Sequence, residues 1–157
     1  MKILGARIEE PESAKEIFKE VENYREEKDT FIQLFDVEKV VGREHLLWAL
    51  QKAEECFENG ENRADSLEME TLLWSSAEWQ IKDALDKMGI EDGAKKAVVM
   101  IDGDEEKFLE YMGWNRDDDL LEASEDKLKN FGVEEKLIST TEKPYDLVFE
   151  KMATSIL

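Results

Sequence analysis

Three short apolar segments rich in β-branched residues, separated by longer stretches with helical periodicity, set the main constraint on the fold. The segments near residues 2–8, 30–36 and 96–101 have the length and composition of β-strands. The stretches between them carry apolar residues at spacings of three and four, as amphipathic helices do. We therefore expect an α/β fold in which a small mixed sheet is packed by several helices. At 157 residues, a single domain spanning 1–157 is expected.

Capping signals predict where several helices begin. A Ser or Asp placed three positions before a Glu can form a capping box, in which each side chain bonds the backbone N–H of the other residue. The chain has such pairs at Ser13-x-x-Glu16, Asp65-x-x-Glu68 and Ser75-x-x-Glu78. We expect each pair to begin a helix, with a break or sharp bend before the last of them.

The most regular apolar stripe lies over residues 44–58, where a helix should pack on the core and end at Asn59-Gly60. Another helix is expected from Ser124 to Phe131. Pro144 should start the C-terminal helix. The apolar face of that helix comprises Tyr145, Val148, Phe149, Met152 and Ile156.

The formal net charge of −19 is the most unusual global property. It argues against broad, nonspecific binding to nucleic acid or to anionic membranes, although a local basic site remains compatible with it. No apolar run is long enough to span a bilayer, and the N-terminal segment lacks the apolar core of a signal peptide. The single cysteine, Cys56, has no partner for an internal disulfide. We expect a cytoplasmic protein without membrane contact.

His45, the only histidine, is the first candidate for catalysis. The positive end of a helix dipole lowers the basicity of a histidine at the helix start, which would suit a neutral general base. General-base catalysis also needs partner groups at hydrogen-bond distance, and the sequence has no recognisable set. Glu70 falls on a face expected to be buried, so it should have a hydrogen-bonding or cationic partner. We expect His45 and Glu70 to have structural roles. The alternative is a small acid–base enzyme that uses His45 and Glu70.

Cofactor and metal signals are missing from the sequence. One His and one Cys do not make a zinc site. The acidic turn from Asp102 to Glu106 lacks the twelve-residue pattern of a calcium loop. The chain contains none of the patterns GxxxxGK[ST], GxGxxG and GxSxG. We expect no catalytic residues, no metal, no cofactor and no small-molecule substrate.

Two tryptophans interrupt polar helix faces. Trp48 is expected to point away from the apolar stripe of its helix. Trp79 is expected to point away from Ile81 and Leu85, which belong to the apolar stripe of a later helix. Such residues are either covered by another element of the same domain or anchor a binding partner. The sequence leaves both interpretations open.

The segment from residues 31 to 90 resembles a known family, the kinase-binding regulatory subunit of the KEOPS complex (TPRKB family). A weaker similarity follows at Lys151-Met152-Ala153. The matching residues are Gln33, Phe35-Asp36, Gly42, His45-Leu46-Leu47, Ala49, Asn62, Ala64, Ser66-Leu67, Glu70, Leu72-Leu73, Gln80-Ile81, Ala84 and Met88-Gly89.

The resemblance implies a non-enzymatic subunit. KEOPS attaches threonylcarbamoyl to the adenosine beside the anticodon of ANN-decoding tRNAs, and another subunit performs the chemistry. Members of this family dock on the N-lobe of an atypical kinase-like ATPase subunit. Archaeal members also hold the 3′ CCA end of tRNA. In place of the basic residue that the family often has before the Gln-Ile pair, this chain has Trp79.

Two considerations predict site residues: the resemblance to this family, and the large side chains that do not belong to the apolar stripes of the helices. We expect Trp48 or Leu147 to contact the kinase-like subunit. For tRNA, we expect Trp79 to stack on a base while Arg63 and Lys82 contact phosphates. A stand-alone acidic protein-interaction domain without a tRNA role is a further alternative.

Overall fold

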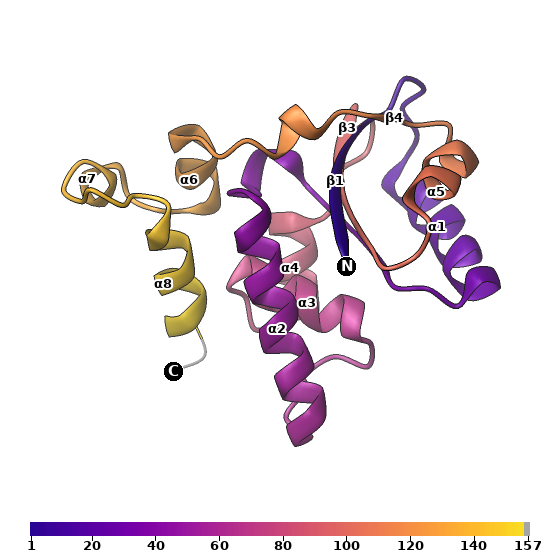
Figure 1. The fold of residues 1–157 in the computed structure, drawn as a ribbon. Helices are drawn as coiled ribbons and strands as arrows, with labels where there is room; N and C mark the ends of the chain where they lie inside the picture. Colours follow the sequence, from indigo (N-terminus) through magenta and orange to yellow (C-terminus); the bar gives the residue numbers. More distant parts are fainter. Residues whose placement is uncertain (156–157) are drawn as a thin grey trace. The chain divides into compact units, whose positions relative to one another are not determined.

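The computed structural model describes residues 1–155 (Figure 1), so the expected contact of Ile156 lies outside the described residues. The chain divides into two compact units. The sheet unit comprises Met1–Val37 and Gly89–Leu121, and the helical unit comprises Glu38–Met88 and the chain from Glu122 onward. The expectation of one domain over residues 1–157 stays a prediction.

The sheet unit contains four strands in the order β2-β3-β1-β4. In chain order its elements are β1 (Lys2–Arg7), α1 (Ala14–Lys28), β2 (Ile32–Phe35), β3 (Lys96–Ile101), α5 (Glu105–Met112), β4 (Asn115–Arg116) and the 3₁₀ helix η2 (Asp118–Leu121). The three strands predicted from the sequence are confirmed, as is the α/β class. The two-residue β4 carries no strand signal of its own.

The strand pairings are all antiparallel, although a mixed sheet was expected. β3 lies between β1 and β2 and runs against both, so the two strands that share a direction do not pair with each other. Val99 therefore lies opposite Leu4 on one side and Leu34 on the other. The alternation of strand and helix along the chain did not reveal this insertion, because it depends on pairing between distant residues.

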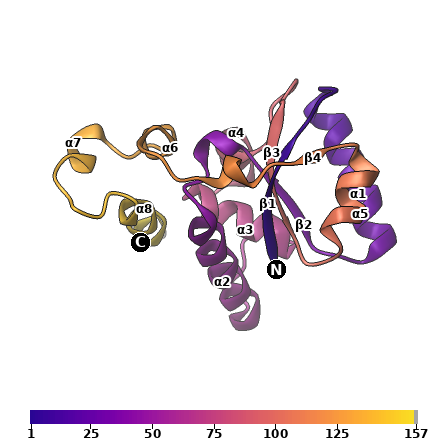
Figure 2. The same cartoon turned by 45° about the horizontal axis from the view of Figure 1, so that its top comes forward.

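Helices α1 and α5 lie on the same face of the sheet (Figures 1 and 2). The α1 side chains Ile17 and Val21 pack with the sheet residues in one buried cluster, and Phe108 joins them from α5. Ser13 caps α1 as predicted, because its hydroxyl accepts a hydrogen bond from the backbone N–H of Glu16. On β1, Gly5 lies where a Cβ would collide with the carbonyl oxygen of Asp117.

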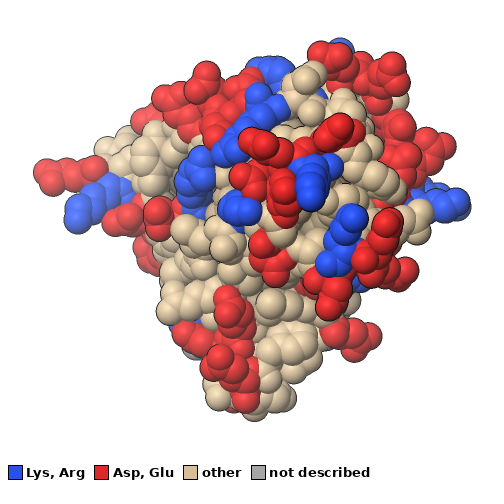
Figure 3. All heavy atoms as spheres, turned by 45° about the vertical axis from the view of Figure 1, so that its right-hand side comes forward, with Lys and Arg blue, Asp and Glu red and all other residues tan. Residues whose placement is uncertain are grey.

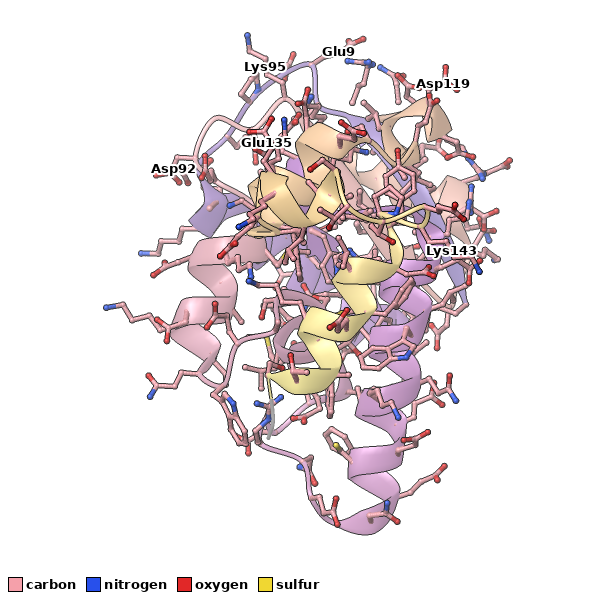
Figure 4. All side chains as sticks on the ribbon, turned by 90° about the vertical axis from the view of Figure 1, so that its left-hand side faces the viewer. Glu9, Asp92, Lys95, Asp119, Glu135 and Lys143 are labelled. Atoms are coloured by element: carbon pink, nitrogen blue, oxygen red, sulfur yellow. The ribbon has the colours of Figure 1, made fainter. Side chains whose placement is uncertain are left out.

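The helical unit is built around α2 (Arg43–Asn59), the helix predicted over residues 44–58. Helices α3 and α8 pack against it, and α8 is the yellow helix in Figure 4. Gly60 ends α2 in the left-handed conformation, as Asn59-Gly60 predicted. The other elements of the unit are α3 (Leu67–Ser76), α4 (Ile81–Met88), α6 (Glu125–Phe131), α7 (Glu135–Ile138) and α8 (Asp146–Thr154), and the 3₁₀ helix η1 (Val37–Lys39) precedes α2.

Two of the predicted caps are wrong. Ser66, not Asp65, caps α3, because its hydroxyl accepts from the backbone N–H of Met69. Ser75 lies inside α3, where its hydroxyl donates to the carbonyl of Leu72. The predicted break before the next helix is present, and Ala77 makes it in the left-handed conformation. A Ser/Asp-x-x-Glu pattern therefore does not settle which of several neighbouring polar residues caps a helix.

Candidate interaction site

His45 lies near the start of α2 with its imidazole fully buried. Its Nδ1 accepts a hydrogen bond from the backbone N–H of Val41 at 3.0 Å, and its Nε2 donates to the carbonyl oxygen of Ser75 at 2.8 Å. These partners fix the neutral tautomer with the proton on Nε2, because a backbone N–H only donates and a carbonyl only accepts. The Phe131 ring meets the imidazole edge-on, with 5.0 Å between the ring centroids.

Burial lowers the pKa of His45 from 6.5 to about 4, since its surroundings disfavour the charged imidazolium. The hydrogen bond to the Ser75 carbonyl opposes this shift, and the charge of Lys87 adds to it. Both ring nitrogens are engaged by the backbone, which leaves neither to exchange a proton with a substrate. This geometry favours the predicted scaffold role and disfavours the acid–base alternative.

Glu70 has the hydrogen-bonding and cationic partners expected for it. Its Oε2 accepts hydrogen bonds from the backbone N–H groups of Arg63 and Ala64, both at 2.8 Å. Its Oε1 lies 3.8 Å from Arg63 Nε, an ion-pair distance rather than a hydrogen bond. The carboxylate is fully buried, so it acts as an internal anchor that ties the loop after α2 to the first turn of α3.

Aromatic and cationic side chains form a continuous row through the helical unit. The Arg63 guanidinium carbon lies 4.7 Å from the ring centroid of Trp79 and 5.7 Å from that of Trp74. Trp74 meets Trp48 at 5.8 Å between centroids, and Trp48 meets Phe149 of α8 at 6.3 Å. We call these five side chains the stacked row, in which the Trp74, Trp48 and Phe149 rings meet edge to face. Two of the predicted site residues, Arg63 and Trp79, therefore lie in contact.

One end of the stacked row opens on a surface groove. Its lining comprises Glu44, Leu47, Trp48, Gln51 and Phe149. Trp48 is half-buried, so both interpretations of this residue describe part of its environment: α3 and α8 cover one side, and the groove exposes another. We call this surface the Trp48 groove.

Leu147, the second residue expected to contact the kinase, lines a different groove. That groove is bounded by α6, α7 and α8, and its lining comprises Gly132, Val133, Glu134, Leu137, Leu147, Glu150, Lys151 and Thr154. Leu137 is 48% exposed there. Both surfaces share α8, which presents Phe149 to the Trp48 groove and Leu147 to the other.

At the other end of the stacked row, Trp79 is 52% exposed. Its indole N–H donates a hydrogen bond to the carbonyl oxygen of Ser155. Lys82 is exposed in the first turn of α4. Arg63 is less available than the sequence predicted, because its side chain is only 19% exposed and its charge faces the Glu70 carboxylate.

The protein surface is otherwise strongly acidic. Figure 3 shows one face, on which Asp and Glu side chains are widely spread with Lys and Arg among them. Within residues 1–155, no three His, Cys, Asp or Glu side chains come together in a way that could hold a metal ion. Over the same residues, none of the helices has the length and apolar character needed to cross a membrane.

The stacked row and the two grooves that share α8 place aromatic and apolar side chains at the surface of the helical unit. We next compared the chain with known protein families. The sequence model of one family, described as kinase binding protein CGI-121, matches residues 10–153. The chain belongs to this family. The match confirms the family predicted from the sequence and extends the similarity over nearly the whole chain. A search among curated proteins finds no match to the chain.

For this CGI-121 family member, the sequence missed two features of the site. The role of Phe149 in covering Trp48 was hidden because it belongs to α8, about a hundred residues away along the chain. The contact of the Trp79 indole N–H with the Ser155 carbonyl was hidden for the same reason, because Ser155 follows α8. Only the three-dimensional arrangement of the helical unit brings such residues together.

Proposed function

We propose that the protein is a non-catalytic regulatory subunit of the KEOPS complex, which modifies tRNA with threonylcarbamoyladenosine. In this proposal it binds the kinase-like ATPase subunit in the cytoplasm and forms one functional domain. The observation that carries the proposal is the match to a kinase-binding family, together with an apolar groove in the helical unit. The engagement of both His45 nitrogens by the backbone supports the absence of catalysis.

Trp48, in the Trp48 groove, has the properties of a residue that anchors an interface. Trp48 is held from behind by Trp74 and from the side by Phe149, so little side-chain entropy would be lost when a partner covers it. Leu47 beside it is 38% exposed, which adds apolar surface. Aromatic residues held in this way are frequent among the residues that dominate binding energy. We assign the kinase contact to this groove and to Leu147 on the other side of α8.

Trp48→Ala should weaken binding of the kinase-like subunit about thirtyfold, because removal of an interface anchor costs about 2 kcal/mol. Leu147→Ala should also weaken binding of the kinase-like subunit. The measurement is calorimetric titration of the purified subunits. Phe57→Ala is the matched control, since Phe57 is also an aromatic residue of α2 and is 36% exposed, yet does not line the groove.

Circular dichroism and thermal unfolding must show that the Trp48→Ala protein is still folded, because Trp48 also packs on Trp74. Unchanged affinity in folded Trp48→Ala and Leu147→Ala proteins would refute this assignment of the interface. A loss in Phe57→Ala equal to that in Trp48→Ala would refute the groove as its centre.

We also propose that Trp79 stacks on a base at the 3′ CCA end of tRNA. Its indole is half-exposed, and Arg63 supports its ring at 4.7 Å. The hydrogen bond from its N–H to Ser155 further fixes the ring. A platform held in this way can accept any base, because every base presents a π-face. With the net charge of −19, such a site should be weak alone and effective when other subunits hold the tRNA.

Trp79→Ala should reduce tRNA affinity roughly tenfold, since stacking on one base contributes about 1–3 kcal/mol. Removal of the CCA end should give a similar loss, and the two changes together should lose little more than either alone. Trp79→Phe keeps an aromatic face and should retain most of the binding. Filter binding of intact and trimmed tRNA measures these differences. Equal binding of both tRNAs would exclude the CCA end as the ligand.

A further inference from the structure

The sheet unit has a surface groove of its own, between the loop that joins β1 to α1 and the C-terminal end of α5. The volume of the groove is about 230 Å³. Its apolar lining includes Ile8, Met112 and Trp114. Ile8 and Trp114 are buried members of the core of the sheet unit, and Met112 is half-buried and packs against that core. The groove therefore has an apolar floor that the core holds in place.

Four glutamates complete the lining of this groove, which contains no Lys or Arg: Glu9, Glu10, Glu12 and Glu20. Glu9 (labelled in Figure 4) accepts a hydrogen bond through its Oε1 from the Asn115 side-chain amide at 2.8 Å. In the part of the chain that the structure describes, the carboxylates of the other three glutamates have neither a hydrogen-bond donor nor an ion-pair partner. We call this surface the acidic groove.

The carboxylates of the acidic groove act on one another. Burial raises the pKa of Glu20, and the charges of Glu12 and Glu16 raise it further. The backbone keeps Glu12 in place, because its carbonyl oxygen accepts a hydrogen bond from the backbone N–H of Gly93 at 2.9 Å. These negative charges are therefore held near one another against their mutual repulsion. A cation that enters the groove would stabilise the charged form of each carboxylate.

The lining of the acidic groove distinguishes between possible occupants. A second copy of this chain would bring its own net charge of −19 and would be repelled. Among the described residues, these glutamates do not converge closely enough to hold a metal ion. Wider spacing around an apolar floor suits a larger organic cation. The side chains of Lys and Arg are such cations, because each joins an apolar methylene stem to a charged head.

We propose that the acidic groove binds a Lys or Arg side chain from a basic segment of a protein partner. The stem of that side chain packs on Met112 and Trp114, and its head lies between the carboxylates of Glu12 and Glu20. Arg fits this arrangement especially well, since its planar guanidinium can donate hydrogen bonds to two carboxylates at once. The acidic groove contains none of the residues assigned above to the kinase-like subunit or to tRNA, so this inference is independent of the proposed function.

The first test uses a capped tripeptide of arginine, leucine and arginine as the probe for the full chain. The salt concentration is about 0.15 M, where a screening length of about 8 Å weakens attraction to distant charges. NMR shifts of the backbone amides give both the location and the affinity of the peptide. We expect shifts in the loop after β1 and at Gly113 and Trp114. The same peptide with citrulline in place of each arginine should bind about tenfold more weakly, because citrulline lacks the charge.

The second test changes the charge of the groove without changing its shape. Glu12→Gln combined with Glu20→Gln should weaken binding of the arginine peptide about tenfold. Glu26→Gln combined with Glu27→Gln is the matched control, since both are exposed glutamates of α1 that do not line the groove. The control removes the same net charge and should leave the affinity unchanged. Met112→Ala keeps the charge and should weaken binding about threefold through lost apolar contact.

Thermal unfolding separates a binding role from a structural one. The variant with Glu12→Gln and Glu20→Gln should be at least as stable as the unmodified protein, because it relieves repulsion between the carboxylates. A lower melting temperature in this variant would assign the two glutamates a structural role and would count against the proposal.

Four further results would overturn the inference. One is the absence of shifts around the groove with the arginine peptide at millimolar concentration. Another is equal binding of the citrulline peptide. An equal loss of affinity in the variant with Glu26→Gln and Glu27→Gln would indicate a nonspecific charge effect. Calcium or magnesium ions that reproduce the shifts at the same amides would make the groove a metal site. Failure of the kinase or tRNA assignments would leave all these measurements unaffected, because they concern the other unit of the chain.

Discussion

Glu70→Ala should lower the free energy of unfolding by about 3–5 kcal/mol, because it removes both a buried hydrogen-bond acceptor and the counter-charge of Arg63. The alanine leaves two backbone N–H groups, those of Arg63 and Ala64, without the carboxylate oxygen that they share. It also leaves the Arg63 guanidinium, which is 19% exposed, without its counter-charge. Urea unfolding of the full chain at neutral pH measures the difference.

Glu70→Gln is the matched control for this prediction. Its amide oxygen can still accept both backbone N–H groups, but the neutral side chain no longer balances Arg63. The loss should therefore be smaller, about 1–2 kcal/mol. Because the loop that Glu70 holds carries Arg63, both variants should also disturb the ring of Trp79, with Glu70→Ala the more severe. An equal loss in the two variants would mean that the ion pair, and not the backbone anchoring, dominates.

The second large effect concerns pH. His45 has a pKa of about 4 in the folded protein and 6.5 as its ordinary value, so the unfolded chain takes up its proton first as the pH falls. The stability that the neutral imidazole contributes is complete above pH 6.5 and is lost progressively down to about pH 4. The total is about 3 kcal/mol, of which about 2 kcal/mol should disappear between pH 7.5 and 5.

His45→Asn and His45→Gln isolate this contribution from the titration of the carboxylates. Asparagine can replace Nδ1 as the acceptor for Val41, and glutamine can replace Nε2 as the donor to Ser75, but neither does both. Each should cost about 2–3 kcal/mol at pH 7.5 and show a shallower loss of stability between pH 7.5 and 5. A slope equal to that of the unmodified protein would show that groups other than His45 set the acid sensitivity.

The fold could be predicted where the signal is local. Ser13 was predicted to cap the start of α1, and Gly60 was predicted to end α2. Few neighbouring residues could cap these helix ends instead, and both predictions are confirmed. At Asp65-Ser66, two capping residues stand side by side, and the serine makes the hydrogen bond. The sheet is antiparallel because β3 lies between β1 and β2 and runs in the direction opposite to both. No local pattern encodes such an insertion, because pairing of distant strands decides it.

The candidate site could be predicted by residue type but not by arrangement. Trp48 and Trp79 stood out because indoles on polar helix faces need an explanation. Their connection through Trp74 and Arg63 depends on how α2, α3 and the loop between them pack.

The tryptophans of the stacked row also give optical signals that can report on binding. The Trp48 and Trp74 rings, 5.8 Å apart and inclined by 72°, are close enough to exchange excitation, which produces paired bands of opposite sign in circular dichroism. A partner that displaces Phe149 from Trp48 would change those bands. A base on the exposed Trp79 would instead quench its emission. Events at the two ends of the row can therefore be distinguished on one unlabelled sample, by dichroism at one end and by fluorescence at the other.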